Sequence, residues 1–245
     1  MVTHYQLKYK SYGERSILIE WPSEIDKYIL HDVLIMKSCI QKNISESILE
    51  VKNAYNSILI SYVLAIDNVN SEILVLKSLY LKKKYQNHDS KKLWKIPVCY
   101  DAEFAIDLEE IASRKGYSKE DIIRLHFEGD YTVCFIGFLP GFLYLEGLNN
   151  ALHFPRRATP RIAVEKGAVG IGNSQTGIYP NLSPGGWNII GNSPVQFFDA
   201  SNAIPCFANA GDKIQFIPIA SYEYQEISFL VANGTYKIES EVING

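Results

Sequence analysis

The spacing of apolar residues over the first eighty positions predicts a small sheet with two helices. Alternating apolar and polar residues predict strands at 5–10 and 16–21 and again at 48–52 and 57–64. Between these pairs, apolar residues recur at steps of three and four, as on one face of a helix, at Ile25, Ile29, Val33, Met36 and Ile40. Ser23 is the expected N-cap of this helix.

A second helix is predicted over residues 71–84. Ile73, Leu76 and Tyr80 lie on one side of it, and the lysines that end it complement the helix dipole. The order strand, strand, helix thus occurs twice in succession. It predicts a two-layer α/β unit with its helices on one face of the sheet.

The run KKKYQNHDSKK at 82–92 predicts a boundary between two domains. It holds five lysines and no aliphatic residue, which is typical of exposed chain. Tyr85 is its single aromatic side chain, so a nucleic-acid patch is the weaker interpretation. We predict an N-terminal α/β domain at 1–85, a linker of about 86–92, and a second domain at 93–245.

The second domain is predicted to be rich in strands. A strand is expected at 94–100, then helices at 107–115, ended by Gly116, and at 118–127, where Ser118 and Asp121 stand at capping-box spacing. Further short strands are expected in YTVCFIGF, RIAVEKGAVGIG, WNIIGNSPVQFFD and DKIQFIPI. Ten of the 16 glycines and six of the 10 prolines fall between Gly137 and Pro194. Such a density of turns is typical of a compact barrel or sandwich.

Composition narrows the class of protein. The 24 basic and 27 acidic residues give a net charge of −3, which favours neither nucleic acid nor an anionic membrane as a partner. The N-terminal MVTHYQLKYK does not resemble a signal peptide, and the sequence contains no apolar run of membrane-spanning length. We therefore expect a cytoplasmic protein. Its four cysteines form no CxxC pair, so we expect reduced thiols and no metal site.

Several catalytic motifs are missing from the sequence. It contains no HExxH, no GxSxG and no Walker A motif. Gly172 and Gly177 have the glycine spacing of a P-loop, but Ile178 and Tyr179 stand where Lys and Ser/Thr would be needed. The chain thus carries no recognisable motif for a nucleotide or other cofactor.

The segment PRRATPR at 155–161 is the strongest candidate for binding an anion. Its three arginines can hold a carboxylate or phosphate, and two prolines stiffen the backbone between them. Glu146 and Glu165 are the only acids between residues 137 and 199 that could neutralise them. The alternative is a solvated loop with structural salt bridges. The candidate residues are Arg156, Arg157, Thr159 and Arg161.

Neighbouring loops carry groups suited to recognising an amide or carboxylate. Their neutral hydrogen-bonding candidates are Gln175, Thr176, Tyr179 and Ser183. Candidate pocket-wall residues are Phe138, Pro140, Phe142 and Trp187, with buried loop anchors as the alternative for the aromatic residues of the 137–142 turn. His126 is a possible proton-transfer group, and the alternative for it is a structural histidine.

Several of these segments together resemble a known family. WKIPVCY at 94–100, GFLPGF at 137–142, PRRATPR at 155–161, QTGIYP at 175–180 and SPGGW at 183–187 closely resemble the family of the 5-oxoprolinase B subunit (PxpB-like), also called allophanate hydrolase subunit 1 or KipI-like. The resemblance covers about 90–240 and is looser in the N-terminal part. Where the family usually has Arg-Thr-Pro, this chain has Asn192-Ser193-Pro194, which removes one potential anion contact.

The resemblance implies both a fold and a function. It implies an α+β protein, with a small N-terminal α/β domain followed by a cyclophilin-like β-barrel. It implies the B subunit of a hydrolase complex that converts 5-oxo-L-proline to L-glutamate, using ATP with Mg at the level of the complex. The implied partners are a homologous C subunit (KipA-like) and an A subunit, and the isolated chain is expected to be inactive. The alternatives are a KipI-like inhibitor of a histidine kinase and a carboxyltransferase-type half of a urea carboxylase or allophanate hydrolase-like system.

Overall fold

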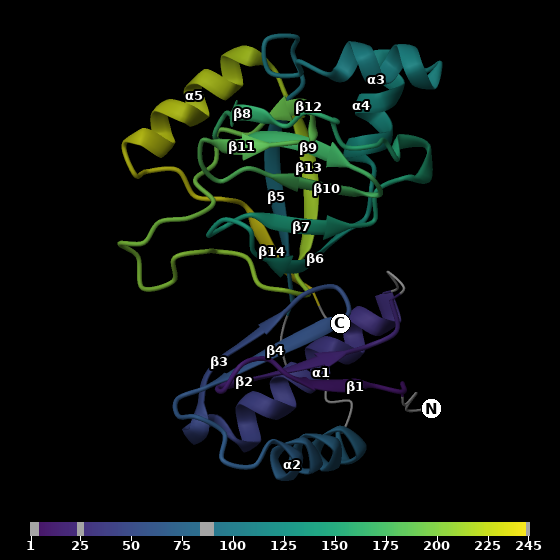
Figure 1. Cartoon of the computed structure of the whole chain (residues 1–245). Helices are drawn as coiled ribbons and strands as arrows, with labels where there is room; N and C mark the ends of the chain where they lie inside the picture. Colours follow the sequence, from purple (N-terminus) through teal and green to yellow (C-terminus); the bar gives the residue numbers. More distant parts are fainter. Residues whose placement is uncertain (1–4, 24–26, 84–90, 244–245) are drawn as a thin grey trace. The chain divides into compact units, whose positions relative to one another are not determined.

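The computed structural model describes residues 5–23, 27–83 and 91–243 (Figure 1). The chain divides into two compact units, residues 1–89 and 90–245. Residues 24–26 of the predicted first helix and 86–90 of the predicted linker lie outside the described residues. Lys91 and Lys92, at the end of the predicted linker of about 86–92, are the first two residues of a strand.

The first unit is a four-stranded antiparallel sheet with two helices. The strands run in the order β1-β2-β4-β3. In β2 and β4 every second residue is buried, so one face of the sheet is covered and the other is partly open. The elements are β1 (Lys8–Ser11), β2 (Ser16–Glu20), α1 (Lys27–Asn43), the 3₁₀ helix η1 (Ser45–Ser47), β3 (Ile48–Asn53), β4 (Ser57–Tyr62) and α2 (Val69–Lys82).

The helices cover that face of the sheet with the apolar stripes that the sequence predicts (Figure 1). Ile29, Val33, Met36 and Ile40 of α1 are all at most 2% exposed, which confirms the predicted stripe over the described part of the helix. Helix α2 begins two residues earlier than predicted, because the side chain of Asn68 caps it by accepting from the N–H of Ser71 at 3.0 Å.

A buried carboxylate joins the two helices of this unit. Asp32 of α1 accepts hydrogen bonds from Nε1 of Trp21 and from the hydroxyl of Tyr80, both at 2.8 Å, and pairs with Nζ of Lys83. Lys83 is buried, although we expected it on an exposed run. Its ammonium is compensated by Asp32, which is the condition for burying a charge.

The second unit is built mainly of strands. Its elements are β5 (Lys91–Cys99), α3 (Leu108–Lys115), α4 (Lys119–Phe127), β6 (Tyr131–Ile136), β7 (Leu143–Glu146), η2 (Asn150–Leu152), β8 (Arg161–Val164), β9 (Ala168–Gly172), β10 (Gln175–Ile178), β11 (Ser183–Gly185), β12 (Asn188–Asn192), β13 (Lys213–Ile219), α5 (Ser221–Ala232) and β14 (Ser240–Ile243). Helices α3 and α4 confirm the prediction. Gly116 ends α3 with φ of 71°, and Ser118 caps α4.

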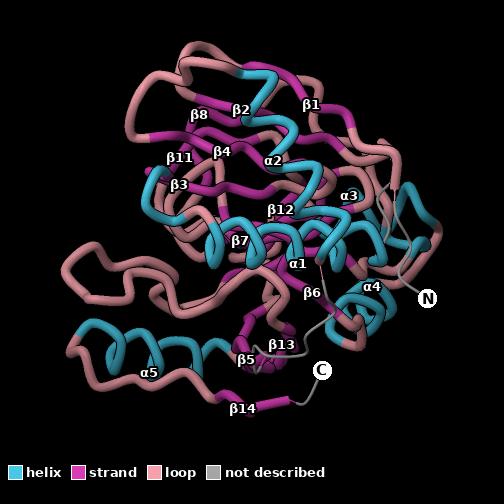
Figure 2. The backbone as a smooth tube through the Cα atoms, turned by 90° about the horizontal axis from the view of Figure 1, so that it is seen from below, coloured by secondary structure: helices cyan, strands magenta, loops and turns pink. Residues whose placement is uncertain are grey.

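Seven strands of this unit close into a barrel. The order is β12-β9-β10-β7-β6-β13-β5, and Asn192 of β12 pairs with Cys99 of β5 to complete the circle. Strand β13 runs parallel to β5 on one edge, and β14 pairs with the start of β5 on the other (Figure 2). The small sheet-and-helix unit followed by a barrel confirms the predicted α+β class. No helix of the described ranges has the length and apolar character needed to cross a bilayer.

The run RIAVEKGAVGIG holds two short strands, β8 and β9, because Gly167 turns the chain between them with φ of 82°. Strand β8 then pairs with β11 in a separate ribbon. Helix α5 was not predicted. Its apolar residues form no buried stripe, and Ala220 at its N-cap has no polar side chain.

Candidate functional site

The outward face of β9 and β10 is lined with glycines that make room for Trp187. A Cβ atom on Gly172 would lie 2.7 Å from Cε2 and Nε1 of the indole, and one on Gly177 would lie 3.1 Å from its Cζ3. Such distances are too short for non-bonded atoms, so the ring rests directly on the strand backbones. Arg156 lies against the same indole, with its Cζ 5.4 Å from the ring centroid.

Further aromatic side chains surround this indole. Phe142 and Tyr144 meet Trp187 edge-on, with ring centroids 5.5 and 5.8 Å away, and Phe135 stacks on Tyr144 at 4.3 Å. Of the predicted wall residues, Phe142 and Trp187 are almost fully buried, whereas Phe138 and Pro140 are exposed. Phe142 is therefore an anchor of its loop, the alternative that we considered for the aromatic turn, whereas the ring of Trp187 carries the guanidinium of Arg156.

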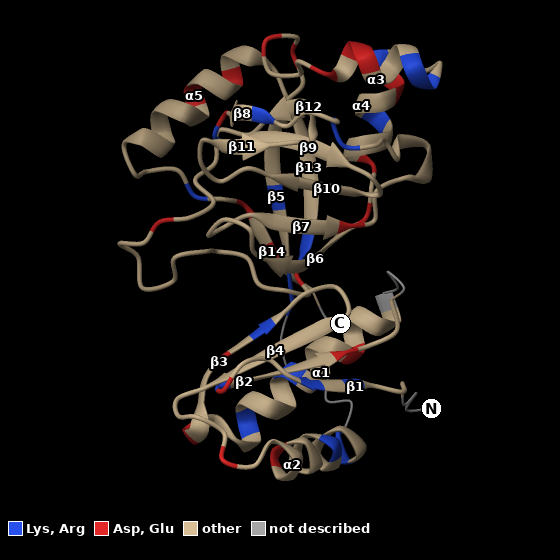
Figure 3. Cartoon of the chain, viewed as in Figure 1, with Lys and Arg blue, Asp and Glu red and all other residues tan. Residues whose placement is uncertain are grey.

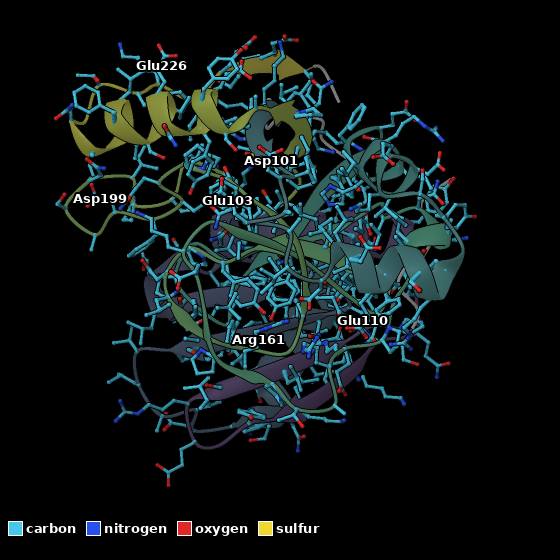
Figure 4. The ribbon with its side chains drawn as sticks, turned by 90° about the horizontal axis from the view of Figure 1, so that it is seen from above. Asp101, Glu103, Glu110, Arg161, Asp199 and Glu226 are labelled. Atoms are coloured by element: carbon cyan, nitrogen blue, oxygen red, sulfur yellow. The ribbon has the colours of Figure 1, made fainter. Side chains whose placement is uncertain are left out.

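Two of the three predicted anion-binding arginines are occupied by one carboxylate. Asp107, the residue before α3, accepts from Nη1 of Arg157 at 3.0 Å and from Nη2 of Arg161 at 2.5 Å. Its other oxygen accepts from the backbone N–H of Ile189 at 2.6 Å. Glu110 of α3 lies 3.6 Å from Arg157. Figure 3 shows acidic and basic positions along α3 and a basic position at β8, and Figure 4 labels Glu110 and Arg161.

For two of the three predicted arginines these contacts favour the salt-bridge alternative. Arg157 and Arg161 act as structural ties between the 155–161 loop, α3 and β12, which matches the salt-bridge alternative. Arg156 is exposed and forms no ion pair among the described residues, so it is the arginine available to an anion. Sequence reasoning missed Asp107 because this acid lies some fifty residues before the arginines. The signal that could have found it is its place at the first position of the helix predicted at 107–115, which we interpreted only as a helix start.

Among the predicted hydrogen-bonding residues, Gln175 is the one that remains available to a ligand. Thr176 points into the barrel, so its neighbour Gln175 projects to the outward face that carries Trp187. Gln175 is 9% exposed, and its side-chain amide makes no hydrogen bond within the described residues but is not among their fully buried unpaired groups. Strand pairing places Gln175 opposite Gly172.

His126 and Thr176 lie in the barrel interior. Thr176 donates to the carbonyl of Gly170 at 3.0 Å, so it accepts from Nε2–H of His126, also at 3.0 Å. Nδ1 then accepts from the hydroxyl of Tyr100 at 2.8 Å. Both ring nitrogens are satisfied by the neutral imidazole, and burial lowers the pKa of His126 to about 3. This environment supports the alternative that His126 is a structural histidine. It also means that Thr176 lies in the interior of the barrel and not at its surface.

The other predicted residues are distributed between core and surface. Tyr179 is 2% exposed and packs beneath Gly185, where a Cβ would lie 2.4 Å from its hydroxyl. Ser183 is buried and donates to the carbonyl of Pro184. Thr159 is exposed on the arginine loop. The structure therefore brings Arg156, Gln175 and Trp187 to one face of the barrel, and we take these three as the candidate site.

A hollow in the first unit is acidic, whereas the candidate face of the barrel carries Arg156. It has a volume of about 590 Å³ between the end of β4 and the start of α2. Three acids line it, Glu46, Asp67 and Glu72, and its lining contains no basic residue. These carboxylates would repel an anionic ligand. The candidate anion site is accordingly the one at Arg156.

Known proteins are similar in sequence to this chain. A family model described as "Carboxyltransferase domain, subdomain C and D" matches residues 7–208. Curated relatives from Bacillus subtilis and Haemophilus influenzae, both named as the B subunit of 5-oxoprolinase, are 40% and 46% identical over 135 and 142 residues. The matches cover 55% and 58% of this chain, but only 56% and 66% of those relatives. These names confirm the resemblance seen in the sequence.

More distant similarities are found within longer proteins, of which this chain covers only a part. Urea amidolyase of Saccharomyces cerevisiae is 23% identical over 95% of this chain and 14% of its own length. Among solved structures, TTHA0988 has a TM-score of 0.73 at 30% identity, covering 84% of this chain and 40% of that one. Urea carboxylase of Kluyveromyces lactis has a TM-score of 0.81 at 20% identity, covering 97% of this chain and 24% of that one, which establishes a shared fold.

Proposed function

Because the chain belongs to the family of carboxyltransferase domains, subdomains C and D, we propose that it is the B subunit of an ATP-dependent 5-oxoprolinase. The observation that carries this proposal is the 40–46% identity to relatives that bear the name of that subunit. The reaction is the hydrolysis of 5-oxo-L-proline to L-glutamate, and this chain contributes part of the substrate site.

The chemistry of the reaction explains why an arginine and an amide suit the site. A lactam is a poor electrophile, so transfer of the γ-phosphoryl group of ATP to its carbonyl oxygen would activate the carbon. Attack by water would then break the ring C–N bond, with the nitrogen taking a proton, to leave an acyl phosphate, and a second water would release phosphate and L-glutamate. This depends on positioning and charge neutralisation more than on a protein nucleophile. We assign the substrate carboxylate to Arg156 and the lactam to Gln175. ATP with Mg belongs to the assembled complex, since this chain has no nucleotide motif.

The proposal includes two partner proteins and an inactive isolated chain. The candidate face holds an arginine and an amide but no group that we can assign as a general base. A homologous C subunit and an A subunit would supply the missing catalytic and nucleotide-binding groups. The assembled hydrolase is then expected to be cytoplasmic.

A second candidate function is a carboxyltransferase half of a urea-handling enzyme. The match to urea amidolyase over 95% of this chain favours it, although at lower identity. This alternative predicts a biotin-carrying partner and no response to 5-oxo-L-proline.

Purification of the chain with its partner subunits tests the proposal. We expect ATP hydrolysis that depends on 5-oxo-L-proline, and an Arg156→Ala variant that raises KM for it by about tenfold, the loss of one charged contact. Arg124→Ala is the matched control, because Arg124 is an exposed arginine of α4 paired with Asp121. Absence of substrate-dependent hydrolysis in the wild-type complex would refute the assignment.

A further inference from the structure

A second, smaller hollow of the first unit lies between α2 and the segment that leads into β1. It has a volume of about 220 Å³. An apolar cavity of about 150 Å³ is enough to hold a benzene molecule, so this hollow has room for a single ring with a short substituent. Five of its six lining residues are aromatic or aliphatic, and the lining is Tyr5, Leu7, Tyr9, Lys77, Tyr80 and Leu81.

The apolar residues of this hollow bring no charge to it. Tyr80 is 5% exposed, and its hydroxyl donates to Asp32 at 2.8 Å and accepts from the backbone N–H of Tyr5 at 2.9 Å. Burial raises the pKa of Tyr9 to about 12, so its phenol is neutral near pH 7. Leu81 is 67% exposed. A ligand that covered it would remove apolar surface from water, which favours binding.

The ammonium of Lys77 stands at the hollow without an acidic partner. Its Nζ lies 5.5 Å from the centroid of the Tyr9 ring, and it makes no ion pair within the residues that the structure describes. Glu72, the acid of α2, lies in the first turn of the helix and accepts from a tyrosine of β4 (Figure 3). Asp32, which holds the Tyr80 hydroxyl, is compensated by Lys83. The hollow therefore joins an apolar surface to a positive charge that no acid neutralises.

We propose that this hollow binds a small carboxylate that carries one aromatic ring. The ring packs against Tyr9 and Leu81, and the carboxylate pairs with Lys77. A second cation would be repelled by the same ammonium, so an amine of the same shape is excluded. With about ten non-hydrogen atoms, such a ligand is expected to bind with a Kd of about 1 mM. The site lies in the first unit and is independent of the proposed function, which rests on the second.

The indole of Trp21 reports whether the hollow is occupied. Its ring centroid lies 6.2 Å from that of Tyr80, and its Nε1 donates to the same oxygen of Asp32 as the Tyr80 hydroxyl. The other two tryptophans, Trp94 and Trp187, belong to the second unit. We expect phenylacetate to shift the Trp21 N–H signal in a ¹H–¹⁵N spectrum of the full chain, with saturation, and to leave the other two in place. Trp94→Phe and Trp187→Phe assign the three signals.

Three related compounds separate the contribution of the ring from that of the charge. Benzyl alcohol keeps the ring but lacks the carboxylate, and it should bind about tenfold more weakly than phenylacetate, the loss of one charge-assisted contact. Benzylamine carries the opposite charge and should give no saturable shift. Acetate lacks the ring and should give none either.

Variants of α2 identify the groups that bind. Lys77→Met keeps the apolar stem and removes the charge, so it should weaken phenylacetate binding about tenfold and leave that of benzyl alcohol unchanged. Lys82→Met is the matched control, an exposed lysine of the same helix outside the lining. Leu81→Asp places a carboxylate at the hollow and should abolish phenylacetate binding. Leu74→Asp alters a leucine that is 66% exposed and outside the lining, and should leave binding unchanged.

Three results would overturn the proposed site. One is the absence of a saturable Trp21 shift up to about 20 mM phenylacetate, far above the expected Kd. Another is binding of benzylamine, or of phenylacetate to Lys77→Met, as tight as that of phenylacetate to the wild type. The third is a Trp21 signal that moves with protein concentration and not with phenylacetate, which would mean that a second copy of the chain covers the hollow. None of these results bears on the oxoprolinase assignment, which turnover of the assembled complex tests.

Discussion

The guanidinium of Arg161 donates to the carboxylate of Asp107 over 2.5 Å, tying strand β8 to the start of helix α3. Asp107 is 3% exposed and also holds Arg157, so one buried acid fixes both ends of the segment between them. Arg156 lies beside Arg157 and reaches the Trp187 ring. The position of the available arginine thus depends on a carboxylate that lies about fifty residues earlier in the chain.

Replacing Asp107 tests this dependence. Asp107→Asn leaves two partly buried guanidiniums without their counter-charge, and we expect the free energy of unfolding to fall by about 2 kcal/mol. Chemical denaturation measures the loss. Glu110→Gln is the control, since Glu110 is half exposed and 3.6 Å from Arg157, and it should change stability by less than about 0.5 kcal/mol. Equal effects of the two substitutions would contradict this account.

A methyl group on Gly172 would push Trp187 off the barrel. The added Cβ would lie 2.7 Å from the indole, so Gly172→Ala should cost about 1–3 kcal/mol of stability. At Gly186 the nearest atom to an added Cβ is 3.7 Å away, and Gly186→Ala should be tolerated. Thermal unfolding of both variants provides the comparison. A Gly172→Ala chain as stable as the wild type would show that the ring does not rest on this backbone.

The buried histidine predicts a specific dependence of stability on pH. Burial lowers the pKa of His126 to about 3, whereas an unfolded histidine titrates near 6.5. Below about pH 6.5 the unfolded chain therefore binds a proton that the native chain does not, and stability falls toward pH 3 by up to about 1.4 kcal/mol per pH unit. His126→Gln can keep the same acceptor and donor and should remove this part of the slope. Denaturation at pH 7, 5.5 and 4.5 measures the slope, and equal slopes in the two proteins would exclude the mechanism.

Asp32, the buried carboxylate of the first unit, should contribute strongly to the stability of that unit. Asp32→Ala leaves the buried ammonium of Lys83 unpaired and removes the acceptor of Trp21 and Tyr80, so a loss of about 3–5 kcal/mol is expected. Trp21 fluorescence follows the unfolding of this unit. Lys10→Met breaks an exposed pair with Glu20 and should cost less than about 1 kcal/mol. If Asp32→Ala were no worse than Lys10→Met, the buried pair would have no structural role.

The sequence was most informative where local spacing determines burial. The helical stripe of α1 and the caps at Gly116 and Ser118 depend on neighbouring residues, and the structure confirms them. It was least informative where distant segments meet. The partner of Arg161 lies on another element, and the burial of Lys83 depends on Asp32, fifty-one positions away. Residue type alone also does not separate Gln175, which faces outward, from Thr176, which faces the interior.

The parallel pairing of β13 with β5 has a consequence for synthesis of the chain. Residues 213–219 lie beside residues 93–99, so the seam of the barrel joins segments separated by about 120 positions. Until residue 219 has left the ribosome, β5 exposes an unpaired row of N–H and C=O groups that can pair with another nascent chain. Shortened versions that stop before this point should therefore collect in inclusion bodies, and chaperones that shield strand edges should raise the yield of the whole protein.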